Sequence, residues 1–269
     1  VDESLMRMTS QMLNSAFGTS VAIADMNGDG ANDIVKDTAL NVPQYVSVSY
    51  NDDSNVGFFD LFDDFHNFAP YHVNVGDLNR DGRIDVVVSD DGSDRIRYNT
   101  GNDTFGRVVW GPAMTFDFVS GGDDGFGSDN YIVDLDGDEW NDVIICDVDV
   151  DIPGCSRRLH IYHNRGGAFG GNVELREERS GSNYGAFGLP QLSGAHDVAI
   201  FDIDNDGDRD LVVGRCNDTR VYMNQRDQLG IDYCSEANGN STGVPADIQA
   251  IGTPSVLAND VTLACVDMP

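Results

Sequence analysis

Positive charge and long apolar runs are both scarce in this sequence. Of 269 residues, 16 are Lys or Arg and 46 are Asp or Glu, so the net charge is −30, and Lys36 is the single lysine. Such an acidic surface repels nucleic-acid phosphates and anionic lipids, so we expect no nucleic-acid partner. Because no stretch approaches the roughly 18 apolar residues of a membrane span, we also expect no membrane insertion.

Cysteine is sparse as well, with five residues in the chain. Cys146 and Cys155 bracket a short acidic excursion after a predicted strand, so they form either a disulfide or two separate thiols. A disulfide would suit a secreted protein, because disulfides persist in oxidising compartments. The remaining three leave one partner missing, and their pairing stays open: Cys216, Cys234 and Cys265.

The acidic residues are concentrated in short motifs. The stretch FDIDNDGDRDLVV, residues 201–213, has Gly207 at position 6 of a loop and acidic residues at positions 1, 3, 5 and 9, namely Asp202, Asp204, Asp206 and Asp210. Two carboxylates about 4 Å apart repel each other by roughly 1 kcal/mol in water, so a cation is expected among them. Alternating oxygen ligands, a glycine at a sharp turn and an exit into a strand are typical of a calcium loop.

The same motif occurs four times. DMNGDGAND, DLNRDGRID and DLDGDEWND begin at residues 25, 77 and 134, and the spacing fits one four-stranded blade per copy. The third copy has Glu139 where the others have glycine, so we expect its turn to form differently, and its calcium binding stays open. We expect about four calcium ions, one per loop, with these candidate ligands: Asp25, Asn27, Asp29, Asp33, Asp77, Asn79, Asp81, Asp85, Asp134, Asp136, Asp138, Asp142, Asp202, Asp204, Asp206 and Asp210.

The motifs lie between predicted strands. An apolar alternation enters each loop, a β-branched run leaves it (DIV, DVVV, DVII and DLVV), and a third apolar segment follows. These segments have the length and composition of strands. An EF-hand would need flanking helices and a Glu at position 12, where the chain has Lys36, Val88, Ile145 and Val213. The pattern therefore predicts an all-β fold and excludes the EF-hand.

The stretch AFGTSVAIADMNGDGANDIV, residues 16–35, resembles the FG-GAP or VCBS repeat of integrin-α-type β-propellers. The other copies match its loop and its flanking strands, so the resemblance covers residues 16–230. It implies a β-propeller that holds calcium in the loop between the first two strands of a blade. Such propellers commonly have about seven blades, so four copies imply a partial propeller, a smaller one, or one with additional degenerate blades.

Beyond residue 230 the repeat stops. Residues 231–269 run through a segment rich in Gly, Ser, Asn and Pro into an alternating strand at Asp260–Val266. They resemble the junction to a further β-rich module in secreted bacterial multidomain proteins. We therefore expect a lead-in over residues 1–15, propeller blades over 16–230, and a linker with the first strand of a truncated module over 231–269. Val1 in place of Met leads us to expect trimming at the N-terminus too.

No catalytic constellation stands out. GNSTG at residues 239–243 matches G-x-S-x-G, but it lacks the preceding strand and following helix of a nucleophile elbow. His160 and His163 lie three residues apart in a predicted strand, so they point to opposite faces and cannot both bind one metal. No ligand spacing is seen at the other histidines, His66, His72 and His196.

Two aromatic segments, interpreted as inserts, are candidate ligand contacts. Residues 58–71 hold several Phe and Tyr beside acids, and residues 110–127 hold Trp110, Phe116 and Phe118. Their rings could stack on sugars, form a protein interface, or pack between blades.

The sequence thus predicts a calcium-binding β-propeller of a secreted or cell-surface protein. We expect an adhesion or ligand-binding scaffold that is not an enzyme and whose partner is an extracellular protein or a glycan. A carbohydrate-binding, lectin-like propeller is the first alternative, and a polysaccharide lyase or hydrolase on a propeller scaffold is the second. Ligand identity, blade number and oligomeric state are left open.

Overall fold

The fold is all-β. The computed structural model describes residues 10–13, 18, 20–38, 44–51, 57–116, 129–146, 159–166, 172–177, 192, 194–224, 247–251 and 262–266. Every secondary-structure element within these ranges is a β-strand, so the expected fold class is confirmed. The chain divides into two compact units, residues 1–200 with 211–222 and residues 201–210 with 223–269.

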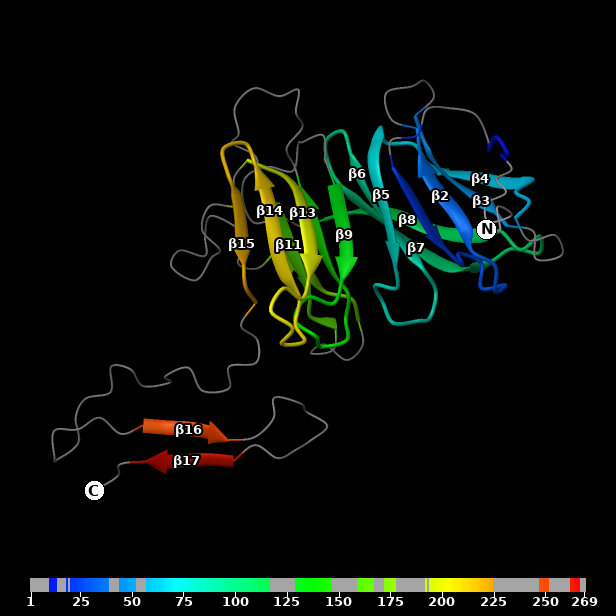
Figure 1. Cartoon of the computed structure of the whole chain (residues 1–269). Coiled ribbons are helices and arrows are strands. Elements are labelled where there is room, and N and C mark those ends of the chain that lie inside the picture. Colours follow the sequence, from blue (N-terminus) through cyan, green and yellow to red (C-terminus); the bar gives the residue numbers. More distant parts are fainter. Residues whose placement is uncertain are drawn as a thin grey trace, which may run out of the picture. The chain divides into compact units, whose positions relative to one another are not determined.

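Consecutive strands pair into one sheet per repeat (Figure 1). Three sheets have four antiparallel strands each, in the orders β1-β2-β3-β4, β5-β6-β7-β8 and β9-β10-β11-β12, and a fourth has the order β13-β14-β15. We name these sheets blades 1 to 4. Their strands are β1 (Val21–Ala24), β2 (Asp33–Asp37), β3 (Val46–Tyr50), β4 (Leu61–His66), β5 (Pro70–Gly76), β6 (Asp85–Asp90), β7 (Arg95–Asn102), β8 (Val108–Thr115), β9 (Asp129–Val133), β10 (Asp142–Cys146), β11 (Leu159–Asn164), β12 (Leu175–Glu177), β13 (Ala195–Phe201), β14 (Asp210–Arg215) and β15 (Thr219–Tyr222).

Each acidic motif connects the first and second strands of its blade. In blade 1, Ala24 at the end of β1 pairs with Asp33 at the start of β2, and in blade 2 Gly76 pairs with Asp85. The corresponding pairing recurs in blade 3. Position 9 of each motif is therefore already a strand residue, while positions 1 to 8 form the connecting loop.

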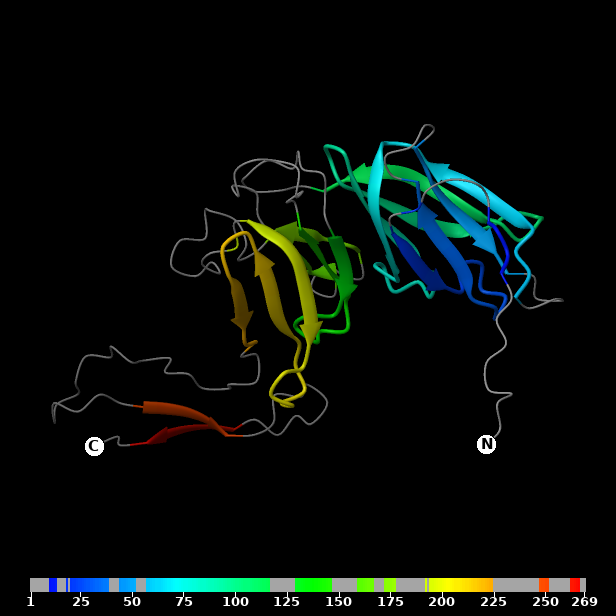
Figure 2. The same cartoon turned by 45° about the horizontal axis from the view of Figure 1, so that its top comes forward.

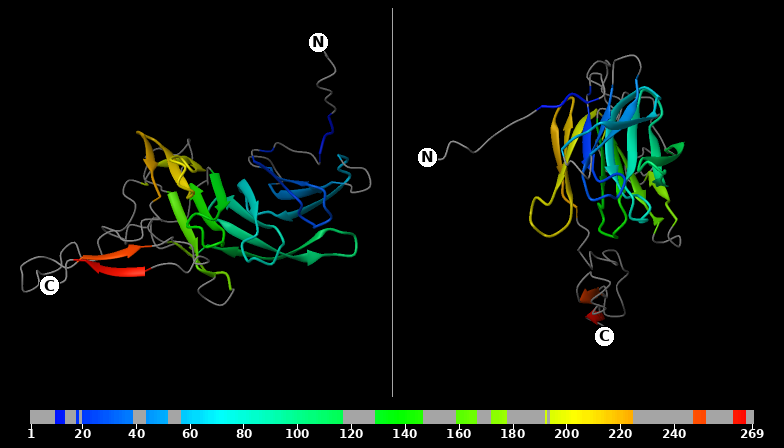
Figure 3. Two further views of the ribbon diagram at one scale, coloured as in Figure 1. Left: turned by 60° about the horizontal axis from the view of Figure 1, so that its bottom comes forward. Right: turned by 90° about the vertical axis from the view of Figure 1, so that its right-hand side faces the viewer.

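The second strand of each inner blade is buried on both faces. On β6, Val86 and Val88 belong to one hydrophobic cluster and Val87 to another; on β10, Val143 and Ile144 divide in the same way. Side chains alternate between the two faces of a strand, so these strands contribute to a core on each side. The three clusters join blades 1 and 2, blades 2 and 3, and blades 3 and 4. Figures 2 and 3 show the successive blades from blue to yellow. Face-to-face packing of blades explains the β-branched runs that follow each loop.

Blades 2 and 3 approach each other closely at Gly76. A Cβ atom added to Gly76 would lie 2.5 Å from Ile132 Cγ2. Any side chain at this position would therefore have to displace the Ile132 side chain or the strand that carries it.

The described parts of the two aromatic segments interpreted as inserts contain β4 and most of β8, the outer, fourth strands of blades 1 and 2. The interpretation was wrong because an outer strand has one exposed edge and tolerates the acids of LFDDFH, which do not follow a buried-strand pattern. Phe65 of β4 stacks on Trp110 of β8, with ring centroids 4.0 Å apart, so these two rings pack between blades. Phe62 is 50% exposed. Residues 117–127 lie outside the described ranges.

The cysteines do not pair as the first alternative expected. Cys146 at the end of β10 is a buried thiol, so no disulfide with Cys155 is formed. Cys216 is disulfide-bonded, and its partner lies outside the described side chains.

Strands β16 (Asp247–Ile251) and β17 (Thr262–Val266) form a separate antiparallel pair, orange and red in Figure 1. β17 coincides with the strand expected near the C-terminus. The division at residue 230 falls outside the described ranges and stays a prediction, as does the GNSTG segment. Within the described segments, no helix has the length and apolar character needed to cross a bilayer.

Candidate metal-binding loops and a neighbouring pocket

The four acidic motifs, named loops 1 to 4 (residues 25–33, 77–85, 134–142 and 202–210), share one backbone conformation. In every loop, positions 4 and 6 have positive φ angles between 58° and 97°. Two left-handed residues so close together turn the chain sharply, and this turn brings the side chains of positions 1, 3 and 5 to one side. The residues concerned are Gly28, Arg80, Gly137 and Asn205 at position 4, and Gly30, Gly82, Glu139 and Gly207 at position 6.

Glu139 takes the conformation that glycine takes in the other loops, with φ 71°. The expectation that loop 3 forms its turn differently is therefore wrong. The left-handed conformation costs a non-glycine residue roughly 1–2 kcal/mol. In return, Glu139 Oε2 lies 2.9 Å from Arg80 Nη2 of loop 2, in an exposed ion pair between two blades.

The aspartate at position 1 of each loop accepts backbone N–H groups of the same loop. Asp25 Oδ1 accepts from Gly28 and Asp29, at 2.7 and 3.1 Å, and Asp25 Oδ2 accepts from Gly30 at 2.9 Å. The position-1 aspartates of loops 2 to 4 likewise accept the N–H of position 6. Each loop therefore folds around its own first carboxylate.

Position 9 holds a buried aspartate that joins the loop to the third strand. In loop 2, Asp85 Oδ2 accepts the N–H of Leu78 at 3.0 Å, and Asp85 Oδ1 accepts the N–H of Asn99 at 2.9 Å. The same two hydrogen bonds recur in the other three loops. We call these four residues the loop-closing aspartates, and all are buried: Asp33, Asp85, Asp142 and Asp210.

Burial raises the pKa of three loop-closing aspartates. The pKa of Asp33 is raised to about 6, and the pKa values of Asp85 and Asp142 are raised to about 7. Loss of solvation is the largest cause, and repulsion from the other carboxylates of the loop acts in the same direction. The loops thus hold carboxylates whose ionised form needs a nearby positive charge.

Sequence reasoning missed the asparagine that lies in the last part of each third strand or just beyond it. Asn99 Nδ2 donates to the Met26 carbonyl of loop 1 at 2.8 Å, and Asn164 Nδ2 donates to the Leu78 carbonyl of loop 2 at 2.9 Å. These bonds link blade 2 to loop 1 and blade 3 to loop 2. The signal was available, because every third apolar segment ends in asparagine. We call these residues the strand-ending asparagines: Asn51, Asn99, Asn164 and Asn224.

The structure brings candidate ligands together to different extents in the four loops. In loop 4, ligand atoms from positions 1, 3 and 5 lie within 4.8 Å of one another, and in loop 3 those from positions 1, 3 and 9 do so. In loops 1 and 2, position 3 is an asparagine, and its Nδ2 donates to the position-5 carboxylate at 2.9 Å. Loops 3 and 4 therefore cluster carboxylate oxygens suited to a hard cation, whereas in loops 1 and 2 the position-3 amide hydrogen-bonds to the position-5 carboxylate.

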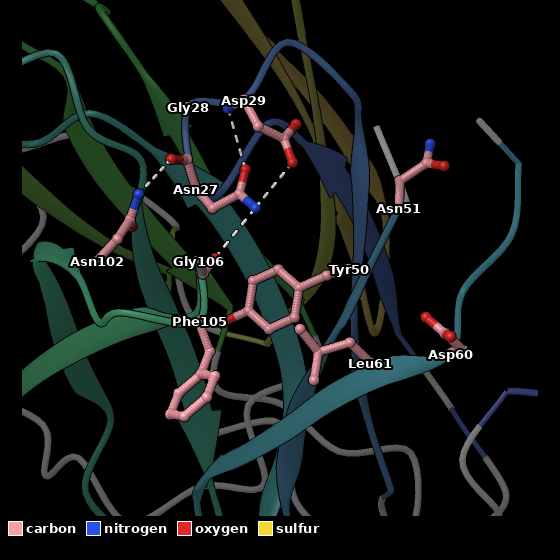
Figure 4. Close-up of a pocket in the computed structure, with 10 residues that line it drawn as sticks. All are labelled: Asn27, Gly28, Asp29, Tyr50, Asn51, Asp60, Leu61, Asn102, Phe105 and Gly106. Atoms are coloured by element: carbon pink, nitrogen blue, oxygen red, sulfur yellow. Dashed lines mark hydrogen bonds between the residues drawn. The ribbon is translucent and has the colours of Figure 1, made fainter. Parts of the chain in front are cut away.

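A pocket of about 520 Å³ adjoins loop 1 (Figure 4). Its lining comes from loop 1, the end of β3, the start of β4 and the hairpin between β7 and β8. Asn27 Nδ2 donates to the Gly106 carbonyl at 3.1 Å, and Asn102 Nδ2 donates to the Asn27 carbonyl, so the hairpin is attached to the loop. The Phe105 ring at the hairpin tip is 74% exposed. The pocket thus combines two aromatic rings, those of Tyr50 and Phe105, with amide and carboxylate groups.

The family of the FG-GAP-like repeat matches residues 77–145 and 134–213. Together the two matches span half of the chain and contain loops 2, 3 and 4. The chain belongs to the FG-GAP repeat family. Loop 1 has the same backbone turn and the same closing hydrogen bonds as the matched FG-GAP repeats, and the propeller architecture expected from the sequence is confirmed.

Comparison with known proteins adds distant likenesses only. No curated protein matches the FG-GAP chain. Among solved structures, a lectin from Agrocybe aegerita that recognises non-reducing terminal N-acetylglucosamine is 20% identical, with a TM-score of 0.42 over 77% of this chain and 49% of the lectin. The Tc holotoxin pore of Photorhabdus luminescens is 16% identical, with a TM-score of 0.36 over 79% of this chain and 11% of that one. The chain thus spans about half of the lectin and a small part of the toxin.

The histidines of the FG-GAP blades lie apart, as their spacing predicted. His160 faces the buried Glu177, with 2.9 Å between His160 Nδ1 and Glu177 Oε1. His163 points the other way, and its Nε2 lies 2.8 Å from Asp136 Oδ2 in loop 3. They do not share a site, but His163 reaches a loop that sequence reasoning assigned to oxygen ligands alone.

Proposed function

We propose that this chain is the calcium-stabilised propeller region of a secreted or cell-surface protein, and that it binds an extracellular ligand without catalysing a reaction. The observation that carries the ligand-binding proposal is the pocket beside loop 1. Its volume falls within the roughly 300–1,000 Å³ of small-ligand sites.

Calcium is the ion that the donor sets of loops 1, 2 and 4 fit. These loops offer carboxylate, amide and backbone oxygens, which are the ligands calcium takes, six to eight at a time. The ion would supply the positive charge that the clustered carboxylates need. The loop residues would hold it with positions 1, 3, 5 and 9, and the strand-ending asparagines would keep position 9 in place. An ion present at about 100 times its dissociation constant stabilises the folded state by roughly 2.7 kcal/mol per site.

Calcium in loop 1 and the pocket are coupled through Asn27. This residue is a candidate ligand, it lines the pocket, and it holds the hairpin that carries Phe105. Removing the ion would free the Asn27 side chain and loosen one wall of the pocket. Ligand binding should therefore depend on calcium even if the ligand never touches the ion.

The chemistry of the pocket favours a glycan as the second, more specific candidate. An exposed aromatic ring beside amide and carboxylate groups offers both a flat apolar face and hydrogen-bonding groups, which a sugar ring needs. Phe105, Asn102 and Asp60 supply these groups. The loop-closing aspartates do not suit a general base, because they are buried and each accepts two backbone N–H groups.

The first experiment is a thermal melt with calcium and with excess chelator, together with a metal count on the purified chain. We expect bound calcium and a large fall in melting temperature on chelation. A chain that holds no calcium and melts at the same temperature in both conditions would overturn the calcium proposal.

Ligand binding is tested on a glycan array and with extracellular proteins, in calcium and in chelator. Phe105→Ala should abolish binding, whereas Phe201→Ala, which truncates a 45% exposed phenylalanine outside the pocket, should leave it intact. Equal binding by both variants would place the ligand elsewhere. Release of products from acidic polysaccharides would show that the chain is an enzyme instead.

A further inference from the structure

Loop 3 differs from loops 1, 2 and 4 in the side chain that the third strand of its blade brings against it, that of His163. His163 precedes the strand-ending asparagine of blade 3, where blades 1 and 2 have Tyr50 and Tyr98. Its Nε2 lies 2.8 Å from Asp136 Oδ2. Position 3 is a carboxylate in loop 3 but asparagine in loops 1 and 2. Blade 3 therefore brings an imidazole and an additional carboxylate to a place where blades 1 and 2 have neither.

Three ligand atoms already converge at this place. One atom each from Asp136, Asp138 and His163 lies within 4.8 Å of the others. The side chains of His163 and Asp136 are 27% and 41% exposed, while the His163 Nε2 atom itself is buried against the loop. Two ligands of a tetrahedral zinc ion, each about 2.0–2.1 Å from it, lie about 3.3 Å apart. The His163 Nε2 and Asp136 Oδ2 atoms would need to move apart by only about half an ångström to bind the same ion.

A second observation comes from the first aspartate of loop 3, Asp134, which is half-buried. Asp134 Oδ1 is inaccessible to solvent and accepts no hydrogen bond from the described residues. The same oxygen of Asp25 and of Asp77 accepts two backbone N–H groups. A buried carboxylate oxygen without a donor is unfavourable, and a cation would satisfy it. Asp134 also shares a 4.8 Å group with Asp136, so a carboxylate oxygen of Asp134 adjoins the same cluster.

We propose that loop 3 binds a divalent first-row transition metal of the zinc class. The nitrogen of His163 and the carboxylates of Asp136 and Asp138 form the ligand set, and Asp134 supplies a further oxygen. Imidazole suits zinc and its neighbours in the first row, whereas calcium takes oxygen ligands. Loops 1, 2 and 4 lack an imidazole at the corresponding position, so the preference belongs to loop 3 alone.

Zinc titration in the presence of saturating calcium tests this proposal. The tag-free chain is stripped of metal, returned to millimolar calcium, and titrated with zinc chloride by calorimetry. We expect one zinc ion per chain, and an affinity at least about 10-fold weaker in His163→Tyr, because loss of groups that hold a metal typically costs 10- to 100-fold. Tyrosine is the residue of blades 1 and 2 at this position, so the variant should fold. Asp138→Asn should weaken zinc binding without changing the volume of the side chain.

His72→Gln is the matched control. Its imidazole has a similar exposure, 30%, but faces a single carboxylate, that of Asp129, at 3.8 Å. This variant should bind zinc as the wild type does. The visible spectrum of the cobalt-loaded chain should show nitrogen ligation in the wild type and lose it in His163→Tyr.

The proposal is overturned if the wild type binds no zinc in calcium, or if both His163→Tyr and Asp138→Asn bind it as tightly as the wild type. Neither result would affect the calcium proposal for loops 1, 2 and 4. The calcium proposal is tested separately, by the calcium count and by the thermal melt in chelator.

Discussion

Asp85→Ala isolates the structural role of a loop-closing aspartate from its role as a metal ligand. The carboxylate is fully buried and accepts the N–H groups of Leu78 and Asn99, at 3.0 and 2.9 Å. Alanine would leave two buried N–H groups without an acceptor, at about 1–3 kcal/mol each, so we expect a loss of about 2–6 kcal/mol. For a domain of this size, about 4 kcal/mol lowers the melting temperature by about 8–16 °C.

The assay is urea unfolding, followed by far-ultraviolet circular dichroism, in calcium and in excess chelator. The loss should appear in chelator as well as in calcium, because both hydrogen bonds belong to the protein alone. Asp91→Ala, which truncates an exposed aspartate just after β6, should change stability by less than about 0.5 kcal/mol. A loss seen only in calcium would refute the reasoning, since it would make Asp85 a metal ligand and nothing more.

Three further predictions follow from the loops. In chelator, stability should fall as pH rises from about 4 to about 7. Burial raises the pKa of the loop-closing aspartates of loops 1 to 3 to between about 6 and about 7. The folded state therefore binds more protons than the unfolded state in this pH window, and raising the pH favours unfolding. Urea midpoints that rise with pH would contradict this. Gly82→Ala, at φ 79° with open space around it, should lower the free energy of unfolding by about 1 kcal/mol. Glu139→Gly should leave the free energy of unfolding unchanged, because relief of the left-handed conformation offsets the lost ion pair. Thermal melts compare the two variants. Asn99→Ala should cost about 1–3 kcal/mol by leaving the Met26 carbonyl without its donor, and an unchanged urea midpoint would show that this link between blades is dispensable.

The spacing of the acidic motifs was enough to predict the blades, because position in the motif fixes which residues lie in the loop and which begin the second strand. The spacing was not enough to predict that the aspartate at position 9 hydrogen-bonds to the third strand. Asp85 is held by Asn99, and that contact depends on how the third strand pairs with the second. The outer strands were misread as inserts because an exposed edge imposes little pattern on residues such as those of β4.

The pocket could not be predicted from sequence, since its lining combines four segments from two blades. The role of His163 escaped for a related reason. The spacing of His160 and His163 was used to ask whether the two histidines share a metal. The residue that His163 contacts, Asp136, comes from loop 3 of the same blade.

The strand-ending asparagines give the propeller a direction. Asn99 donates a hydrogen bond to loop 1 and Asn164 donates one to loop 2, so blades 2 and 3 are each bonded to the loop of the preceding blade. In an array of this kind, stability is set by terms between nearest neighbours rather than by one shared core. Ordering one loop with an ion would fix the carbonyl that the next blade binds, and the benefit would pass along the array from the N-terminal side. Removing the first blade should therefore weaken the second through the lost acceptor, while removing a later blade would leave the asparagine contacts of the blades before it intact.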